Sequence, residues 1–69
     1  MKLQTKITIV PSRALGLYCL ESLVGRTGVV VENRYDSEGV YKGSWVKIDG
    51  APYRGEQEWY IPRDSISTL

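Results

Sequence analysis

The segment Trp59–Ile66 constrains the fold more strongly than any other part of the chain. Proline has no N–H to give to a strand ladder, so we expect Pro62 to end the strand with which this segment begins. Asp64 and Ser65 favour a single 3₁₀-like turn, because their side chains can bond nearby backbone groups. Ile66 then starts a last extended stretch. A strand, a tight turn and a further strand in such close succession are typical of small β-barrels.

Alternating apolar and β-branched residues predict further strands along the chain. The polar loop Asp36–Gly39 carries a glycine where a positive φ is needed, so it is expected to join two antiparallel strands. Turn signals recur at near-regular spacing, which indicates an all-β barrel or sandwich. The five expected strands are Lys6–Val10, Val29–Tyr35, Tyr41–Ile48, Glu58–Ile61 and Ser65–Thr68.

The two-residue period of a strand assigns these side chains to faces. Trp45 and Lys47 are expected on the face that points away from the core, because their neighbours in the same strand are smaller apolar residues. The side chains expected toward the core are Ile7, Ile9, Ser44, Val46, Ile48, Trp59, Ile61 and Ile66.

Residues 12–23 leave two interpretations open. Their leucines have roughly helical spacing and Ser12 suits a helix N-cap. Gly16 weakens a helix by about 1 kcal/mol, so a loop with apolar anchors fits equally well. In both cases the segment is expected to pack on the body of the domain. Cys19 is expected to be a small buried side chain there.

Length and composition restrict the remaining possibilities. A chain of 69 residues allows one domain, which we assign to residues 1–69. Nine Lys and Arg against eight Asp and Glu give a net charge of +1, which is weak for a domain that binds nucleic acid mainly through charge. One cysteine and no histidine exclude an internal disulfide and disfavour a zinc site. We therefore expect no metal, no cofactor and no enzymatic activity. The apolar run Ile7–Val10 is too short for a signal sequence or a membrane span, so we expect a cytoplasmic protein without membrane contact.

The last two-thirds of the chain resemble an SH3-like barrel. In Src-homology-3 domains a tryptophan opens the third strand, and a hydrophobic-proline-turn-hydrophobic element precedes the last strand. Trp45 and the run Ile61–Ile66 occupy those places, and the resemblance covers roughly Val24 to Leu69. It implies a small five-stranded SH3-like barrel. The family's acidic, tyrosine-rich stretch is absent and Ser65 stands where a tyrosine is expected, so the family's proline-rich ligand is not carried over.

Two further resemblances concern function. The run Gly25–Val30 is similar to the Gly-x-x-Gly-x-Val turn and strand of KOW-type barrels in ribosomal proteins and transcription factors, which implies contact with RNA or DNA. The spacing from this turn to Trp59–Pro62 is also similar to that of short SH3-like proteins of bacteria and their mobile elements. A plasmid-encoded dihydrofolate reductase family builds its site from such barrels at a tetramer pore. Its Val-Gln-Ile-Tyr element is not matched by Glu58–Ile61, so its activity is not carried over.

The aromatic residues provide the candidate site. The chain has no phenylalanine, so every aromatic side chain carries a polar group that suits a partly wet position. The alternative is that these rings fill the core of a small domain, which we favour for Trp59. The candidate binding face consists of Tyr35, Tyr41, Trp45 and Tyr60 with Arg34, Lys42 and Lys47 beside them. We expect a binding or assembly module for a protein partner or a second copy, with nucleic-acid binding as the alternative and an oligomeric enzyme as the third hypothesis.

Overall fold

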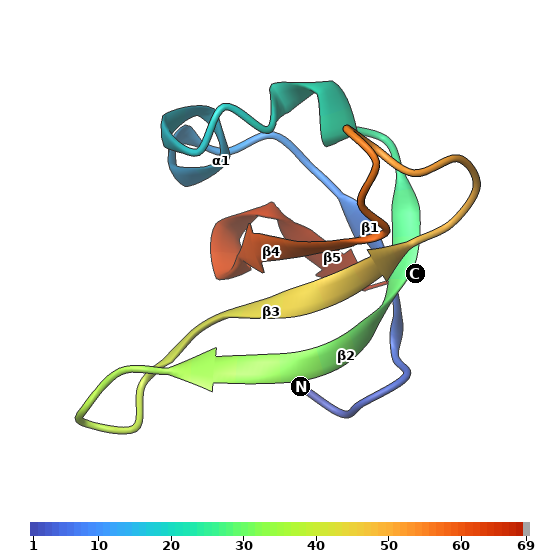
Figure 1. The fold of residues 1–69 in the computed structure, drawn as a ribbon. Helices are drawn as coiled ribbons and strands as arrows, with labels where there is room; N and C mark the ends of the chain where they lie inside the picture. Colours follow the sequence, from blue (N-terminus) through green and yellow to red (C-terminus); the bar gives the residue numbers. More distant parts are fainter. Residues whose placement is uncertain (69) are drawn as a thin grey trace.

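The computed structural model describes residues 1–68 and contains one five-stranded antiparallel sheet of order β4-β3-β2-β1-β5 (Figure 1). All five predicted strands are present, with ends that differ by one or two residues from those expected. Short helical segments lie between β1 and β2 and between β4 and β5. The strands are β1 (Lys6–Ile9), β2 (Thr27–Tyr35), β3 (Tyr41–Ile48), β4 (Glu58–Pro62) and β5 (Ile66–Thr68), and the helical segments are α1 (Arg13–Leu17), η1 (Glu21–Leu23) and η2 (Arg63–Ser65).

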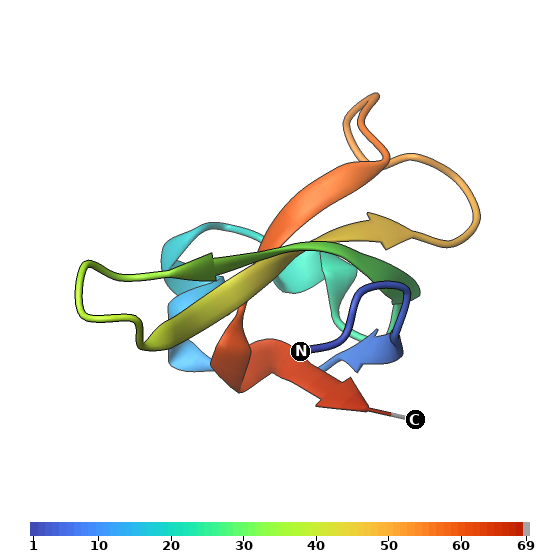
Figure 2. The same cartoon turned by 90° about the horizontal axis from the view of Figure 1, so that it is seen from below.

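Strands β4 and β5 are the two edge strands of the sheet. Within residues 1–68, no ladder of backbone hydrogen bonds joins them. The hydrogen-bonded pairing therefore gives an open sheet, where the sequence predicted a barrel. Strand β2 connects the two parts of this sheet, because its first residues pair with β1 and nearly its whole length pairs with β3. Figures 1 and 2 show β2 and β3 continuing past the body of the domain as a long hairpin.

Two extra residues interrupt the pairing of β2 with β3. Val30 pairs with Val46 and Glu32 with Trp45, which leaves Val31 unpaired on β2. Further along, Lys42 is the unpaired residue of β3. Each extra residue bends its strand and exchanges the two faces beyond it. The bulge at Val31 explains why the faces of residues 29–35 do not follow a single alternation in the sequence.

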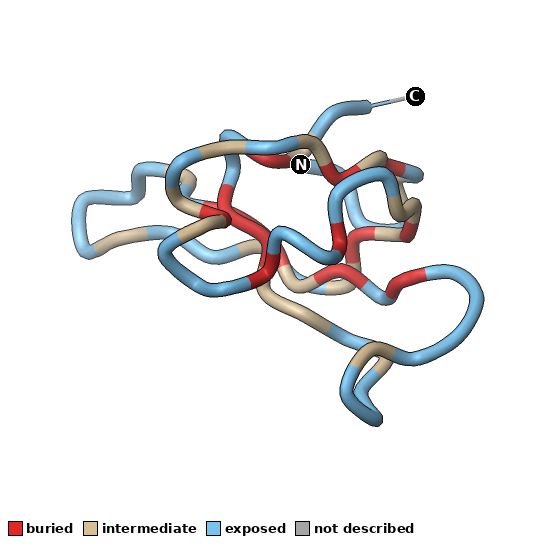
Figure 3. Tube along the Cα trace, turned by 90° about the horizontal axis from the view of Figure 1, so that it is seen from above, coloured by how far each residue is buried: buried red, intermediate tan, exposed pale blue. Residues whose placement is uncertain are grey.

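The core is formed by aliphatic side chains from both parts of the sheet and from the helical segments (Figure 3). Ser44, Val46 and Ile48 face it, as the strand period predicted. Trp59 and Ile66 are partly buried and pack against the same cluster. The buried apolar residues are Ile7, Ile9, Leu15, Leu20, Leu23, Val30, Val46, Ile48 and Ile61.

The segment 12–23 forms a short helix followed by a 3₁₀ turn. Ser12 caps α1, since its Oγ accepts a hydrogen bond from Leu15 N at 3.1 Å. The expectation that Cys19 is buried is wrong: its side chain is exposed. Cys19 ends the helical turn with φ of +58°, a left-handed conformation, and the next residue that turns to the core is Leu20.

A pair of serines ties α1 to the turn before the last strand. Ser65 is fully buried, and its Oγ lies 2.5 Å from Ser12 Oγ. The carbonyl of Ser65 also accepts a hydrogen bond from Val10 N at 2.8 Å. The start of α1 is thereby held against η2.

Removing the Ser65 hydroxyl should weaken this connection. We expect Ser65→Ala to lower the free energy of unfolding by about 1 kcal/mol, because Ser12 loses a partly buried hydrogen-bond partner. Urea denaturation should show a lower midpoint with an unchanged slope. Ser67→Ala, at an exposed position of β5, is the control and should change stability by less than about 0.5 kcal/mol. Equal stability of Ser65→Ala and the unmodified chain would contradict the proposed role of this pair.

Candidate functional site

An open pocket of about 340 Å³ lies between α1 and the β4–η2 segment. We call it the aromatic groove. Tyr18, which follows α1, and Tyr60 of β4 give it two rings. Its remaining lining residues are Ala14, Lys42, Pro62, Arg63 and Asp64.

Three aromatic rings form a continuous row at this groove. Trp45 and Tyr60 are cross-strand partners on β3 and β4, with ring centroids 6.1 Å apart and planes at 65°. Tyr60 also meets Tyr18 edge to face, at 5.9 Å and 82°. Such arrangements place the positive edge of one ring near the negative face of the next and are favourable beyond their burial. The structure thus joins two predicted site residues to Tyr18, which the sequence left in an ambiguous segment.

Gly43 determines where Tyr60 can lie. A Cβ atom at position 43 would collide with the carbonyl oxygen of Ile61 and would stand 2.7 Å from the Tyr60 hydroxyl oxygen. The phenol of Tyr60 therefore crosses β3 at Gly43, which has no side chain to block it. The neighbouring Lys42 is the bulged residue of β3, and bulges frequently redirect a side chain next to a binding site.

The Tyr60 side chain is partly buried, and this affects its hydroxyl. Burial raises the pKa of Tyr60 above its ordinary value, and the nearby phenols of Tyr18 and Tyr41 act in the same direction. The charge of Arg34 opposes this shift. A tyrosine phenol is protonated at neutral pH in any case, so the Tyr60 hydroxyl has a proton to donate in a hydrogen bond.

The other predicted aromatic residues form a separate pair on the β2–β3 hairpin. The ring centroids of Tyr35 and Tyr41 are 5.9 Å apart. The Tyr41 hydroxyl oxygen lies 2.5 Å from Ser44 Oγ, and Ser44 in turn donates to Asn33 Oδ1 at 2.7 Å. These bonds satisfy the buried Ser44 hydroxyl and anchor Tyr41. Tyr35 is 55% exposed.

The three predicted basic residues differ in their placement. Lys42 lines the groove, and its Nζ lies 3.7 Å from Asp36. Arg34 pairs with Gly43 across the β2–β3 ladder and acts on the Tyr60 hydroxyl through its charge. Lys47 is exposed further along β3, and it is not among the groove-lining residues. Arg63 of η2 also lines the groove, and its side chain is about half exposed.

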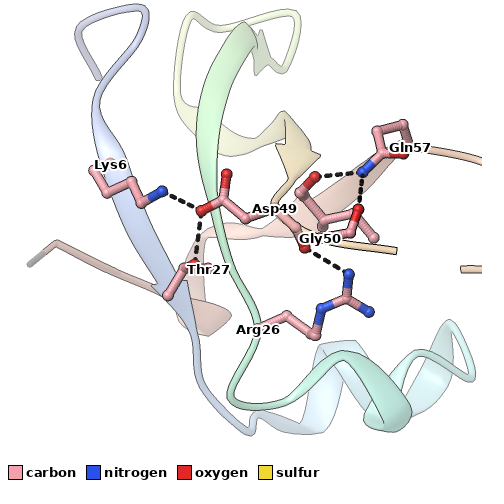
Figure 4. A network of polar contacts seen from close by, with 7 residues as sticks. Lys6, Arg26, Thr27, Asp49, Gly50 and Gln57 are labelled. Carbon is pink, nitrogen blue, oxygen red and sulfur yellow. Dashed lines mark hydrogen bonds and ion pairs between the residues drawn. The ribbon is translucent and has the colours of Figure 1, made fainter. Parts of the chain in front are cut away.

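A second polar cluster lies around Asp49 in the connection after β3 (Figure 4). The Asp49 carboxylate pairs with Lys6 and accepts a hydrogen bond from Thr27 Oγ1 at 2.7 Å. Arg26 donates to the carbonyl oxygens of Asp49 and Ala51. Each of these bonds links the connection to β1 or to the start of β2, which indicates a structural role for the cluster.

The side chain of Gln57 completes this cluster. Its Nε2 donates to the carbonyl oxygens of Ile48 at 2.6 Å and of Gly50 at 3.0 Å. The long connection between β3 and β4 is therefore closed on itself by hydrogen bonds. In the described part of the chain, no group of three or more His, Cys, Asp or Glu side chains is placed to hold a metal ion. Among the same residues, no helix has the length and apolar character required to cross a membrane.

The fit of Gly43 beneath Tyr60 can be tested by adding one methyl group. We expect Gly43→Ala to destabilise the chain by roughly 1–3 kcal/mol and to displace the Tyr60 ring, because the added atom overlaps backbone of β4. Gly16→Ala is the control: its nearest neighbouring atom would be 4.0 Å away, in ordinary contact. This control should be neutral or stabilising by up to about 1 kcal/mol. Thermal unfolding and the near-ultraviolet circular dichroism of the aromatic residues measure both effects; an unchanged Gly43→Ala variant would contradict the steric account.

The Asp49 cluster predicts an acid-dependent part of the stability. The hydrogen bonds from Lys6 and Thr27 hold the pKa of the Asp49 carboxyl below its ordinary value of 3.8. Stabilisation from a carboxyl with a lowered pKa is present above the unfolded value and is lost as the pH falls through the folded value. Asp49→Asn should therefore be less stable than the unmodified chain at neutral pH and should approach it in strong acid. Denaturant unfolding across this range measures the difference, with Glu38→Gln at the hairpin tip as control; a constant difference at every pH would refute it.

Comparison with known proteins leaves this geometry as the basis for assigning function. No protein-family model, no curated protein and no solved structure matches the chain.

Proposed function

We propose that this chain is a small, non-catalytic binding module with an SH3-like barrel fold, and that its aromatic groove binds an extended segment of a protein partner. The observation that carries the proposal is the row of Trp45, Tyr60 and Tyr18 beside an open pocket. Gly43 gives the central ring of this row its place.

The fold part of the proposal is supported by the topology. Strand β5 returns to pair with β1, so the last strand lies beside the first. The turn η2 separates β4 from β5 at the hydrophobic-proline-turn-hydrophobic element, as the resemblance to SH3 domains implies. β2 contributes to both parts of the sheet, which allows five short strands to surround one core.

A peptide suits the groove better than an enclosed small molecule. The pocket is open to solvent and has a volume at the low end of the range for ligand sites. Tyr18 is 54% exposed, and Trp45 and Tyr60 are partly exposed, so their apolar faces meet solvent. Tyrosine and tryptophan in such positions commonly dominate the binding energy of protein interfaces.

Nucleic-acid binding is less favoured, for a specific reason. In the Gly-x-x-Gly turn that resembles KOW-type barrels, Arg26 is the basic residue, and its guanidinium donates to the carbonyls of Asp49 and Ala51. Lys6 is paired with Asp49 in the same cluster. These two cations therefore stabilise the chain's own loop, and the net charge of +1 offers little to a phosphate backbone.

Selection from a displayed library of random peptides tests the proposal. We expect binders whose affinity falls at least tenfold in Tyr18→Ala, because an exposed ring that contacts the ligand is removed without opening the core. Tyr35→Ala is a matched control, since Tyr35 is also a half-exposed tyrosine with a ring partner but lies on the hairpin away from the groove. Its affinity should be unchanged. A library that yields no binder, or only binders that ignore Tyr18→Ala, would refute the proposed function.

Titration with single-stranded RNA and DNA tests the alternative. We expect no binding even at low salt. Binding that weakens linearly in log affinity against log salt would instead show counterion release by a nucleic-acid-binding surface. That result would make nucleic-acid binding the favoured function and peptide binding the alternative.

A further inference from the structure

The rim of the aromatic groove contains two cationic side chains, Lys42 and Arg63, and one carboxylate, Asp64. Arg34 does not line the groove, and its Nη1 lies 3.5 Å from the Glu32 carboxylate. Among the residues that line the groove, cations therefore outnumber carboxylates by two to one.

Backbone geometry holds both cations at the groove. Lys42 is the unpaired residue of the β3 bulge, so the direction of its side chain is not set by the alternation of faces along that strand. Arg63 Nη1 donates to the carbonyl oxygen of Tyr41 at 3.1 Å, which fixes the guanidinium beside the residue that precedes Lys42. The two cations thus approach the same part of the rim from β3 and from η2.

The ion pairs that these cations make within the chain are weak. Lys42 Nζ lies 3.7 Å from the Asp36 carboxylate, and Arg63 Nε lies 3.8 Å from that of Asp64. Both cationic side chains are about half exposed, and pairs of this kind contribute little to stability. A guanidinium also has five N–H donors, more than these contacts use. A carboxylate from a ligand can therefore bind here at small cost to the fold.

The aromatic rings and the two cations together favour one class of ligand. We propose that the groove recognises an acidic peptide segment, with a Glu or Asp carboxylate between Lys42 and Arg63 and a neighbouring apolar side chain against Tyr18 and Tyr60. This inference rests on the proposed function, because it names the class of segment that the same groove binds. Asp64 then competes with the ligand for Arg63 and sets a limit on its affinity.

The composition of the selected peptides is the first test. The pool that depends on Tyr18 should be enriched in Asp and Glu relative to the unselected library. A pool with no charge preference, or one enriched in Lys and Arg, would overturn the inference while the proposed function stands. An empty pool would overturn both, so the two failures are distinguishable.

The sign of the response to single charge changes is the second test. For the selected peptides, Lys42→Gln and Arg63→Gln should each weaken binding about tenfold, because each removes a charge-assisted hydrogen bond. Asp64→Asn should strengthen binding several-fold by removing the competing carboxylate. Lys47→Gln removes a lysine of the same strand that does not line the groove and should have no effect.

Isothermal titration of the folded variants measures these changes. Thermal unfolding of each variant shows that the fold is retained; Asp64→Asn and Lys47→Gln remove no hydrogen bond that holds strands together. Weaker binding in Asp64→Asn would mean that the ligand is cationic, and it would overturn the inference whatever the behaviour of Arg63→Gln.

Discussion

The close approach of β4 to β3 at Gly43 is the constraint on which the candidate site depends. The carbonyl of Ile61 and the phenol of Tyr60 both occupy space that a side chain at this position would need. With that space open, the Tyr60 ring reaches between Trp45 and Tyr18, and the three rings form one row. A small sheet with one short helix can thereby present three adjoining aromatic side chains at its surface.

A domain of 69 residues buries a small core. Hydrogen bonds between its polar groups therefore also hold the connections between strands in place. Gln57 closes the long connection on itself, and Asp49 fastens it to β1 through Lys6. Ser44 is fully buried, and its hydroxyl is satisfied by Tyr41 and Asn33. Buried polar groups of this kind are tolerated because each has its partner, and they specify register more sharply than apolar contacts would.

Local patterns in the sequence were sufficient to predict the five strands and most of the core, because the two-residue period of Ser44, Val46 and Ile48 is visible without any knowledge of distant contacts. They were insufficient for the groove. The bulges at Val31 and Lys42 depend on which residues meet across the hairpin, and no residue type marks them. The exposure of Cys19 follows from a left-handed backbone that only the packing of its neighbours selects. The predicted candidate face contained Trp45 and Tyr60 but omitted Tyr18, whose position depends on how a short helix docks.

That docking depends on a small buried residue in the turn before the last strand. Ser65 in η2 has a small side chain that is buried and bonds Ser12 at the start of α1. A ring at this position could not fit beneath α1 in the same arrangement, so the serine allows the helix to lie against η2 and β4. Tyr18, at the end of that helix, then brings its own ring to Tyr60. A short helix held by two serines thus adds a third ring to those of β3 and β4, at a groove whose lining also includes Lys42 and Arg63.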